Sequence, residues 1–376
     1  MQMKTTWIHS LKAIAFILLA QSVTFGQLIQ LPDGGVNLKR MTGTRVGVTD
    51  IEITWNAPGV KGREGNLWGT PTAHYGFTVL GFGSDGESPW RAGANENTTI
   101  SFSTDVIING KKLSAGKYGF FIALYQDTST LIFSKISTAW GSYFYNPMND
   151  VLRVGTMQQK DQKQSVERLD YTFSNQTDRS VEIALEWERW RIPMKVEVDL
   201  TATTLASIRS QLSGAMGFDP PSLQAAASWC LNNNVNFEEA LHWIQVAVDP
   251  ALGGVNSFAA LSTKAGLLNK LNRKTEADQA MTQALENASA LEMHGYGRQL
   301  LAEKKVKEAM VIFERNYKKH KGAWPNNGGL MRGYSAMGDL KKALEYARLS
   351  LAQAPNELNK KALEQAIKTL ESGKPL

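Results

Sequence analysis

Seven residues between positions 63 and 96 have side chains that could form a binding or catalytic site. They combine tryptophan with polar and charged groups: Arg63, Trp68, His74, Trp90, Arg91, Asn95 and Glu96. Several lie in glycine-rich stretches, and loops of this kind often carry function. One interpretation is a pocket in which tryptophan stacks on a sugar or small ligand while polar side chains supply hydrogen bonds. The structural interpretation is that Arg91 pairs with Glu96 and Asn95 caps a tight turn.

The same stretch allows a hydrolase hypothesis, in which Glu96 and a second carboxylate such as Asp85 act as acid and base. Glycosidase carboxylates lie roughly 5–10 Å apart across a cleft. The acidic pair Glu186 and Glu188 is spaced for one face of a strand, but the arginines beside it favour a solvated charge ladder. No Gly-x-Ser-x-Gly motif is present, and Cys230 lies in an apolar helical context where a buried hydrophobe is expected. The leading prediction is a non-enzymatic binding protein, with a hydrolase of glycans or peptides as the alternative.

No cofactor and no metal site are predicted. Residues Gly81–Gly86 match Gly-x-Gly-x-x-Gly, but a dinucleotide-binding motif needs a helix directly after it, and Ser88-Pro89-Trp90 leads into strands instead. We therefore predict a loop there. Metal-binding helices often carry histidines four residues apart. That spacing is absent from the histidines after the N-terminal segment, which are His74, His242, His294 and His320.

The N-terminal residues 1–26 are typical of a secretory signal peptide. Lys4 and Lys12 supply positive charge, Ala13–Ala20 is apolar throughout, and Thr24-Phe25-Gly26 offers a cleavage site. An uncleaved anchor is the alternative, although spanning a bilayer takes about 20 apolar residues. We expect a periplasmic or extracellular protein with no membrane span after cleavage. One cysteine cannot form an internal disulfide, and a scattered net charge of +6 does not favour nucleic-acid binding.

Apolar residues alternate with polar ones from about residue 45 to residue 202, as in strands with one buried face. Asn109-Gly110 predicts a two-residue hairpin turn, and Asn175–Asp178 a second turn. Pro193 is expected to break a strand ending at Ile192. We predict an antiparallel β-sandwich of eight or nine strands over 45–202, preceded by an N-terminal segment at 27–44.

The period changes to that of helices after about residue 203. A linker with a short helix is expected at 203–222, where Asp219-Pro220-Pro221 starts the next helix. Four alanines in similar contexts, Ala240, Ala277, Ala309 and Ala343, lie 37, 32 and 34 residues apart. This spacing predicts a tetratricopeptide-like solenoid over 223–376, whose repeat is 34 residues, with a plain helical bundle as the alternative.

Solenoids present concave surfaces, so we expect a protein or peptide partner there and, in the β half, a small ligand or glycan. The basic runs Lys304–Lys307 and Lys318–Lys321 are expected to be solvated faces, although a groove could use them against an acidic partner. A third hypothesis makes the sandwich a structural assembly module of the cell envelope.

Several motifs of the β half occur in the order found in one family. They are Val60–Arg63, Leu67–Gly69, Trp90–Glu96, Asp105-Val106, Ile108–Gly110, Leu113, Ala115–Tyr118, Trp140–Tyr145, Asp150–Val154 and Glu186–Glu188. Over about residues 45–200 the chain resembles the exported bacterial domain of unknown function 2911. The resemblance implies a β domain and no assigned reaction. In the family Tyr75-Gly76 would almost reach Trp90, so Phe77–Pro89 is an insertion that we expect to reshape this region.

Overall fold

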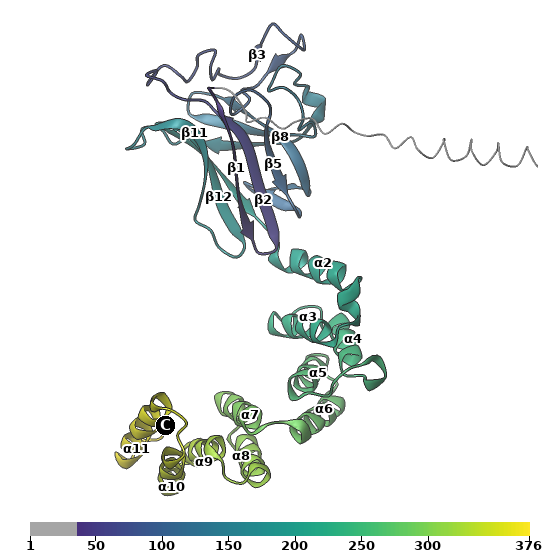
Figure 1. Cartoon of the computed structure of the whole chain (residues 1–376), viewed down its shortest axis with the longest axis vertical. Coiled ribbons are helices and arrows are strands. Elements are labelled where there is room, and N and C mark those ends of the chain that lie inside the picture. Colours follow the sequence, from purple (N-terminus) through teal and green to yellow (C-terminus); the bar gives the residue numbers. More distant parts are fainter. Residues whose placement is uncertain (1–35) are drawn as a thin grey trace, which may run out of the picture. The chain divides into compact units, whose positions relative to one another are not determined.

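The computed structural model describes residues 36–376, so the predicted signal peptide lies outside the described residues (Figure 1). The chain divides into two compact units, with the boundary after Thr204. We call the first the β unit and the second, which starts at Leu205, the helical unit.

The β unit is an antiparallel sandwich, as predicted, with thirteen strands rather than eight or nine among the described residues. A six-stranded sheet has the order β1 (Leu38–Val46), β2 (Thr49–Ala57), β5 (Thr98–Phe102), β8 (Gly116–Leu124), β9 (Thr128–Ser134) and β10 (Asp150–Met157). A five-stranded sheet has the order β11 (Val166–Ser174), β12 (Ser180–Glu188), β13 (Trp190–Glu197), β6 (Val106–Ile108) and β7 (Lys111–Leu113). A short ribbon pairs β3 (Thr78–Val79) with β4 (Glu87–Ser88).

The two sheets share one apolar core, which the inward-facing residues of their strands form. Trp55 of β2 shows how they are joined. Its ring packs edge-on against Tyr171 of β11, with centroids 5.1 Å apart, and its indole N–H donates to the carbonyl of Leu169 at 3.1 Å. This bond satisfies the buried indole N–H of Trp55 across the sheet interface.

Both predicted turns are confirmed, and the predicted strand break is wrong. Asn109 and Gly110 have φ of 44° and 83° and join β6 to β7, as a type I′ turn requires. The second turn connects β11 to β12. Pro193 lies inside β13, opposite Ala184. The neighbouring strand β6 pairs only with Val196 and Glu197 of β13. Proline has no backbone N–H, but no strand among the described residues lies opposite Pro193 on that side, so no inter-strand hydrogen bond is lost there.

The helical unit contains nine helices after α2 (Leu200–Leu212), which begins in the β unit. They are α3 (Pro220–Asn232), α4 (Phe237–Ala247), α5 (Phe258–Lys270), α6 (Lys274–Asn287), α7 (Ala290–Ala302), α8 (Val306–His320), α9 (Trp324–Ala336), α10 (Leu340–Ala352) and α11 (Glu357–Glu371). The predicted start of α3 is confirmed, since Asp219 accepts a hydrogen bond from the backbone of Ser222. Among the described residues, no helix is both long and apolar enough to cross a membrane.

Small residues set how closely these helices approach. The four aligned alanines lie on α4, α6, α8 and α10, and each is at most 1% exposed. Three glycines, Gly297, Gly329 and Gly333, lie against the ring of Phe313, which is itself 0% exposed. Cys230 is fully buried and burial raises its thiol pKa, so the predicted buried role is confirmed.

Candidate functional site

Four tryptophan rings pack against one another in the β unit, and two of them belong to the predicted site. Trp68 stacks on Trp190 at 4.4 Å, and Trp90 stacks on Trp187 at 6.1 Å. Trp68 also meets Trp90 edge-on at 5.7 Å. Trp90 is only 3% exposed. Trp68 and Trp90, which we predicted to stack on a ligand, therefore stack on other tryptophans instead.

Glu188 holds this tryptophan cluster in place. It is the last residue of β12, with a φ of 52°, and its carboxylate accepts 2.8 Å hydrogen bonds from the Trp68 indole and from the Gly65 backbone. At 5% exposed it is buried, so the predicted solvated ladder with Glu186 is wrong. The positive φ breaks the strand alternation, and it redirects the carboxylate inward.

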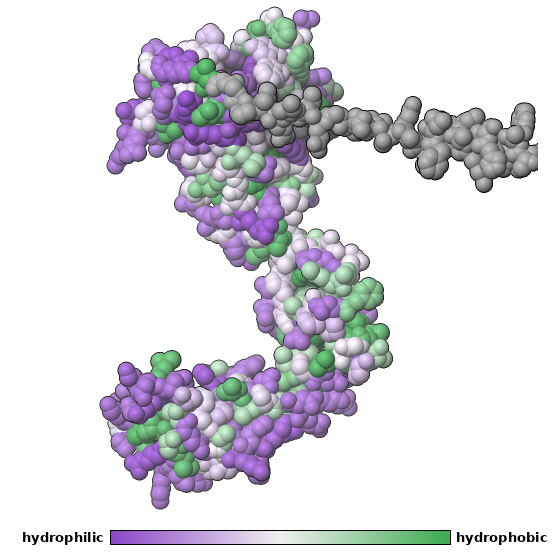
Figure 2. All heavy atoms as spheres, viewed as in Figure 1, coloured by the Kyte–Doolittle hydropathy of each residue, from purple (hydrophilic) through white to green (hydrophobic). Residues whose placement is uncertain are grey.

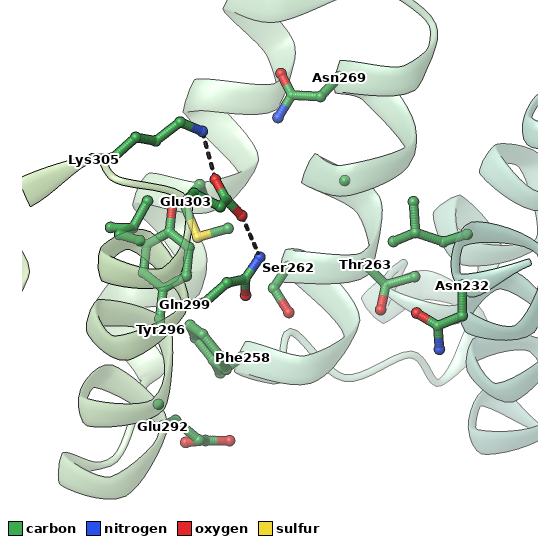
Figure 3. Close-up of a pocket in the computed structure, with 15 residues that line it drawn as sticks. Asn232, Phe258, Ser262, Thr263, Asn269, Glu292, Tyr296, Gln299, Glu303 and Lys305 are labelled. Atoms are coloured by element: carbon green, nitrogen blue, oxygen red, sulfur yellow. Dashed lines mark hydrogen bonds and ion pairs between the residues drawn. The ribbon is translucent and has the colours of Figure 1, made fainter. Parts of the chain in front are cut away.

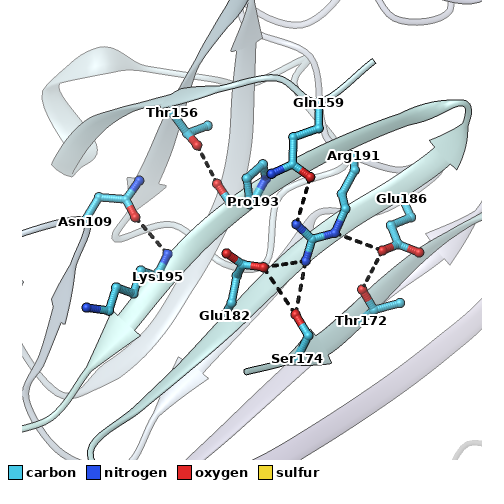
Figure 4. Close-up of polar contacts among 10 residues, drawn as sticks. All are labelled: Asn109, Thr156, Gln159, Thr172, Ser174, Glu182, Glu186, Arg191, Pro193 and Lys195. Carbon is cyan, nitrogen blue, oxygen red and sulfur yellow. Dashed lines mark hydrogen bonds and ion pairs between the residues drawn. The ribbon is translucent and has the colours of Figure 1, made fainter. Parts of the chain in front are cut away.

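Glu186 remains on the outer face of the five-stranded sheet (Figure 4). Arg191 of β13 lies between Glu182 at 2.6 Å and Glu186 at 3.1 Å. It also donates to Ser174 and Gln159. The Arg191 side chain is 13% exposed, so this ion-pair network is partly shielded from water. Every acceptor around it is already paired, as in a structural network.

The predicted pair of Arg91 and Glu96 does not form. Arg91 donates to the carbonyl of Asn95 at 2.9 Å, and its guanidinium lies 4.7 Å over the Tyr143 ring. Glu96 instead accepts a hydrogen bond from Asn56 and lies 3.9 Å from Lys39. The left-handed turn at Asn95, with φ of 53°, separates the two side chains.

The remaining predicted residues have local partners. Arg63 donates to the carbonyls of Gly59 and Val60 at 2.9 and 3.0 Å and to Thr72 at 3.2 Å. His74 is half-buried; burial lowers its pKa, and its Nδ1 has no partner among the described residues. Arg63 therefore anchors its own loop, since its hydrogen bonds close the segment from Gly59 to Thr72.

The proposed second carboxylate, Asp85, is exposed in the connection between β3 and β4. Glu96, by contrast, lies beside Asn56 of β2 and Lys39 of β1. The Gly81–Gly86 stretch is a loop, and the next element is the strand β4 rather than a helix. Nothing in this geometry adds support to an acid–base pair.

The Phe77–Pro89 insertion forms an exposed aromatic surface with residues 140–145. Phe82, 67% exposed, meets Tyr143 edge-on at 5.5 Å and Phe144 at 6.3 Å. Ser84 donates its backbone N–H to the Tyr143 carbonyl at 2.7 Å. Figure 2 shows hydrophobic residues exposed at the end of the β unit that carries β3. Exposed apolar patches mark interaction surfaces in many proteins.

The helical unit contains a groove of about 550 Å³ along α3, α5 and α7, which no motif had indicated (Figure 3). Its apolar side chains include Phe258 and Tyr296, whose rings meet edge-on at 6.3 Å. Glu303 lies at one end, where it pairs with Lys305 at 2.6 Å and accepts from Gln299 at 3.0 Å. The lining residues are Leu231, Asn232, Phe258, Ser262, Thr263, Gly266, Asn269, Met281, Glu292, Gly295, Tyr296, Gln299, Leu300, Glu303 and Lys305.

The amides of Asn232 and Asn269 border this groove and form no side-chain hydrogen bond with the described part of the chain. An amide offers both donors and an acceptor, which match a peptide backbone. A sequence signal existed on α5. Ser262, Gly266 and Asn269 recur every three to four residues as small or polar positions on one helix face.

Across residues 36–376 no three side chains of the metal-binding kinds come together as a candidate metal site. No curated protein matches the chain. Residues 38–196 match the family described as protein of unknown function (DUF2911), and this match runs from the first residue of β1 to the penultimate residue of β13. The resemblance to this family seen in the sequence is thereby confirmed over the β unit.

Proposed function

We propose that this protein binds an extended segment of a partner protein in the groove along α3, α5 and α7. The groove itself is the observation that carries the proposal. Its volume of about 550 Å³ lies within the range of binding sites, roughly 300–1,000 Å³. It also combines aromatic side chains with amides that are free to meet a peptide backbone.

The chemistry of the lining indicates the kind of segment. Phe258, Tyr296 and Met281 offer apolar contacts, which suit one or two apolar anchor residues. Asn232 and Asn269 suit hydrogen bonds to main-chain groups between the anchors. Glu303 and Lys305 pair with each other at the rim, and Glu292 adds one negative charge to the lining.

A tetratricopeptide-like arrangement of the helical unit is part of this proposal. Successive helices pack in pairs, and the pairs α3–α4, α5–α6, α7–α8 and α9–α10 have the closest contacts. The aligned alanines recur on the second helix of each pair, and the first helices of three pairs line the groove. Such stacking produces a continuous surface for extended ligands.

We also propose that the protein acts outside the cytoplasm. The charged, apolar and small-residue segments of residues 1–26 support export, and a single buried cysteine fits a chain that needs no disulfide. Sequencing the N-terminus of protein recovered from the periplasm or medium tests this. We expect the mature chain to begin at Gln27; an intact Met1 in the cytoplasmic fraction would contradict export.

Gly295 offers a direct test of the groove. It lies on α7 in the lining, and a side chain added there would meet nothing within 4 Å. A Gly295→Phe substitution should therefore fill the groove without disturbing the core. Leu349→Phe, at a 44% exposed position on α10, is the matched control.

The assay is selection of displayed random peptides on residues 27–376, followed by fluorescence anisotropy with an enriched peptide. We expect Gly295→Phe to weaken binding about tenfold or more, a loss of roughly 1.4 kcal/mol, and Leu349→Phe to leave it unchanged. Peptides that bind both variants as tightly as the unaltered protein would refute the groove as the site.

A further inference from the structure

A second, smaller cavity of about 120 Å³ lies between α7, α9 and α11 of the helical unit. We call it the basic cavity, because its polar lining is mostly cationic or a hydrogen-bond donor: His294, Arg298, Trp324, Arg332 and Asn359. Its apolar walls include Met331, Leu363 and Ala366. It shares no lining residue with the groove along α3, α5 and α7.

Arg332 is half-buried and Arg298 is exposed. Buried cations normally have an acidic partner. Within residues 36–376, neither Arg298 nor Arg332 has an ion pair or a side-chain hydrogen bond. Burial, with the charge of Arg298 nearby, lowers the pKa of Arg332. No carboxylate contributes to that shift. An unpaired, half-buried guanidinium costs free energy in the empty protein, and a bound anion would remove that cost.

Two further polar atoms, on residues that line the cavity, are unsatisfied within the described part of the chain. The Trp324 indole Nε1 and the His294 Nδ1 are buried without a hydrogen-bond partner in the described part of the chain. Each such group costs free energy if nothing binds it. An indole N–H can only donate, so its partner must be an acceptor. Unpaired cations and an unused donor in one cavity are complementary to an oxyanion.

We propose that the basic cavity binds a single oxyanion group, either a carboxylate or a phosphate. Arg332 and Arg298 supply charge and forked donors, and the Trp324 ring lines the same cavity. The volume sets the size, because about 120 Å³ equals the space of roughly four liquid waters. The group is therefore a small anion, or the anionic end of a larger molecule. This site does not depend on the groove.

The experiment follows the Trp324 indole N–H by NMR on ¹⁵N-labelled residues 27–376, with Trp324→Phe to identify the signal. Inorganic phosphate and acetate are titrated separately, at constant ionic strength maintained with sodium chloride. We expect a saturable shift of that signal. The anion that saturates at lower concentration identifies phosphate or carboxylate chemistry.

Arg332→Gln should abolish the saturable shift, and Arg298→Gln should raise the midpoint about tenfold or more. Arg298 is exposed, so its variant is expected to fold even if Arg332→Gln does not. Arg273→Gln, which removes an exposed arginine paired with Glu276 on α6, is the control and should leave the midpoint unchanged. The proposal is overturned if neither anion gives saturation, or if Arg298→Gln titrates like the control.

Discussion

Gly295 and Gly297 lie two residues apart on α7, and the structure predicts opposite effects for the same substitution. An alanine methyl at Gly297 would lie 2.3 Å from Cε1 of Phe313 and 2.7 Å from two more ring atoms. At Gly295 it would meet nothing within 4 Å. Neither glycine has a positive φ, so backbone strain does not separate the two positions.

The expected magnitudes follow from two opposing contributions. Replacing a helical glycine by alanine stabilises a helix by about 0.8–1 kcal/mol. Overpacking a buried core costs about 1–3 kcal/mol, and Phe313 has little room to move because Gly329 and Gly333 also lie against its ring. We expect Gly295→Ala to raise the free energy of unfolding by up to about 1 kcal/mol and Gly297→Ala to lower it by up to about 2 kcal/mol.

Urea unfolding followed by circular dichroism at the helical band measures both variants against the unaltered protein. A Phe313→Leu change in the Gly297→Ala background should recover part of the loss, because a smaller side chain makes room for the methyl. Equal stability of the two alanine variants would refute the packing around Phe313. A gain in both would show that helix propensity alone decides the outcome.

Two further predictions concern buried polar groups. Glu188→Ala leaves the Trp68 indole and the Gly65 N–H unsatisfied, so it should lower the free energy of unfolding of the β unit by about 1–3 kcal/mol, with a smaller loss for Glu188→Gln. Tryptophan fluorescence in urea measures both variants. An unchanged urea midpoint for Glu188→Ala would contradict the buried role. Burial and the charges of Arg332 and Arg298 lower the pKa of His294 from 6.5 to about 4, so the unfolded chain binds more protons between those values. Stability linked to His294 is therefore complete above pH 6.5 and is lost as the pH falls through about 4, by about 3–4 kcal/mol at most. His294→Gln should flatten the fall in the urea midpoint between pH 7 and pH 4.5, and an identical fall in both proteins would show that other groups cause it.

Local signals predicted the features whose cause is local. Asn109-Gly110 tolerates positive φ at both positions, and Asp219 before two prolines can cap a helix in almost any context. The spacing of the aligned alanines also predicted repeated helices, since helices that approach closely need small side chains where they meet. Each of these depends on a few neighbouring residues, and the structure places each as expected.

Features that depend on distant partners could not be read from the chain. Whether Glu188 faces water or the core is decided by Gly65 and Trp68, more than a hundred residues away. Arg91 and Glu96 have the charges and spacing for a pair, yet Tyr143 and Asn56 bind them instead. A proline disrupts a strand that is paired on both sides. Pro193 is tolerated because β13 pairs with β12 at this position and with no described strand on its other side. In each case the deciding contact joins segments that no local pattern connects.

Helix α7 contributes to both sites of the helical unit through different faces. Glu292, Tyr296 and Gln299 recur at intervals of four and three residues and line the groove, whereas His294 and Arg298, four residues apart, line the basic cavity. Positions 294 and 296 are about 200° apart around a helix with 3.6 residues per turn. A side chain added at Gly295 to fill the groove should therefore leave the oxyanion titration unchanged. If Gly295→Phe shifted that titration, the two faces would be coupled through a movement of α7 itself.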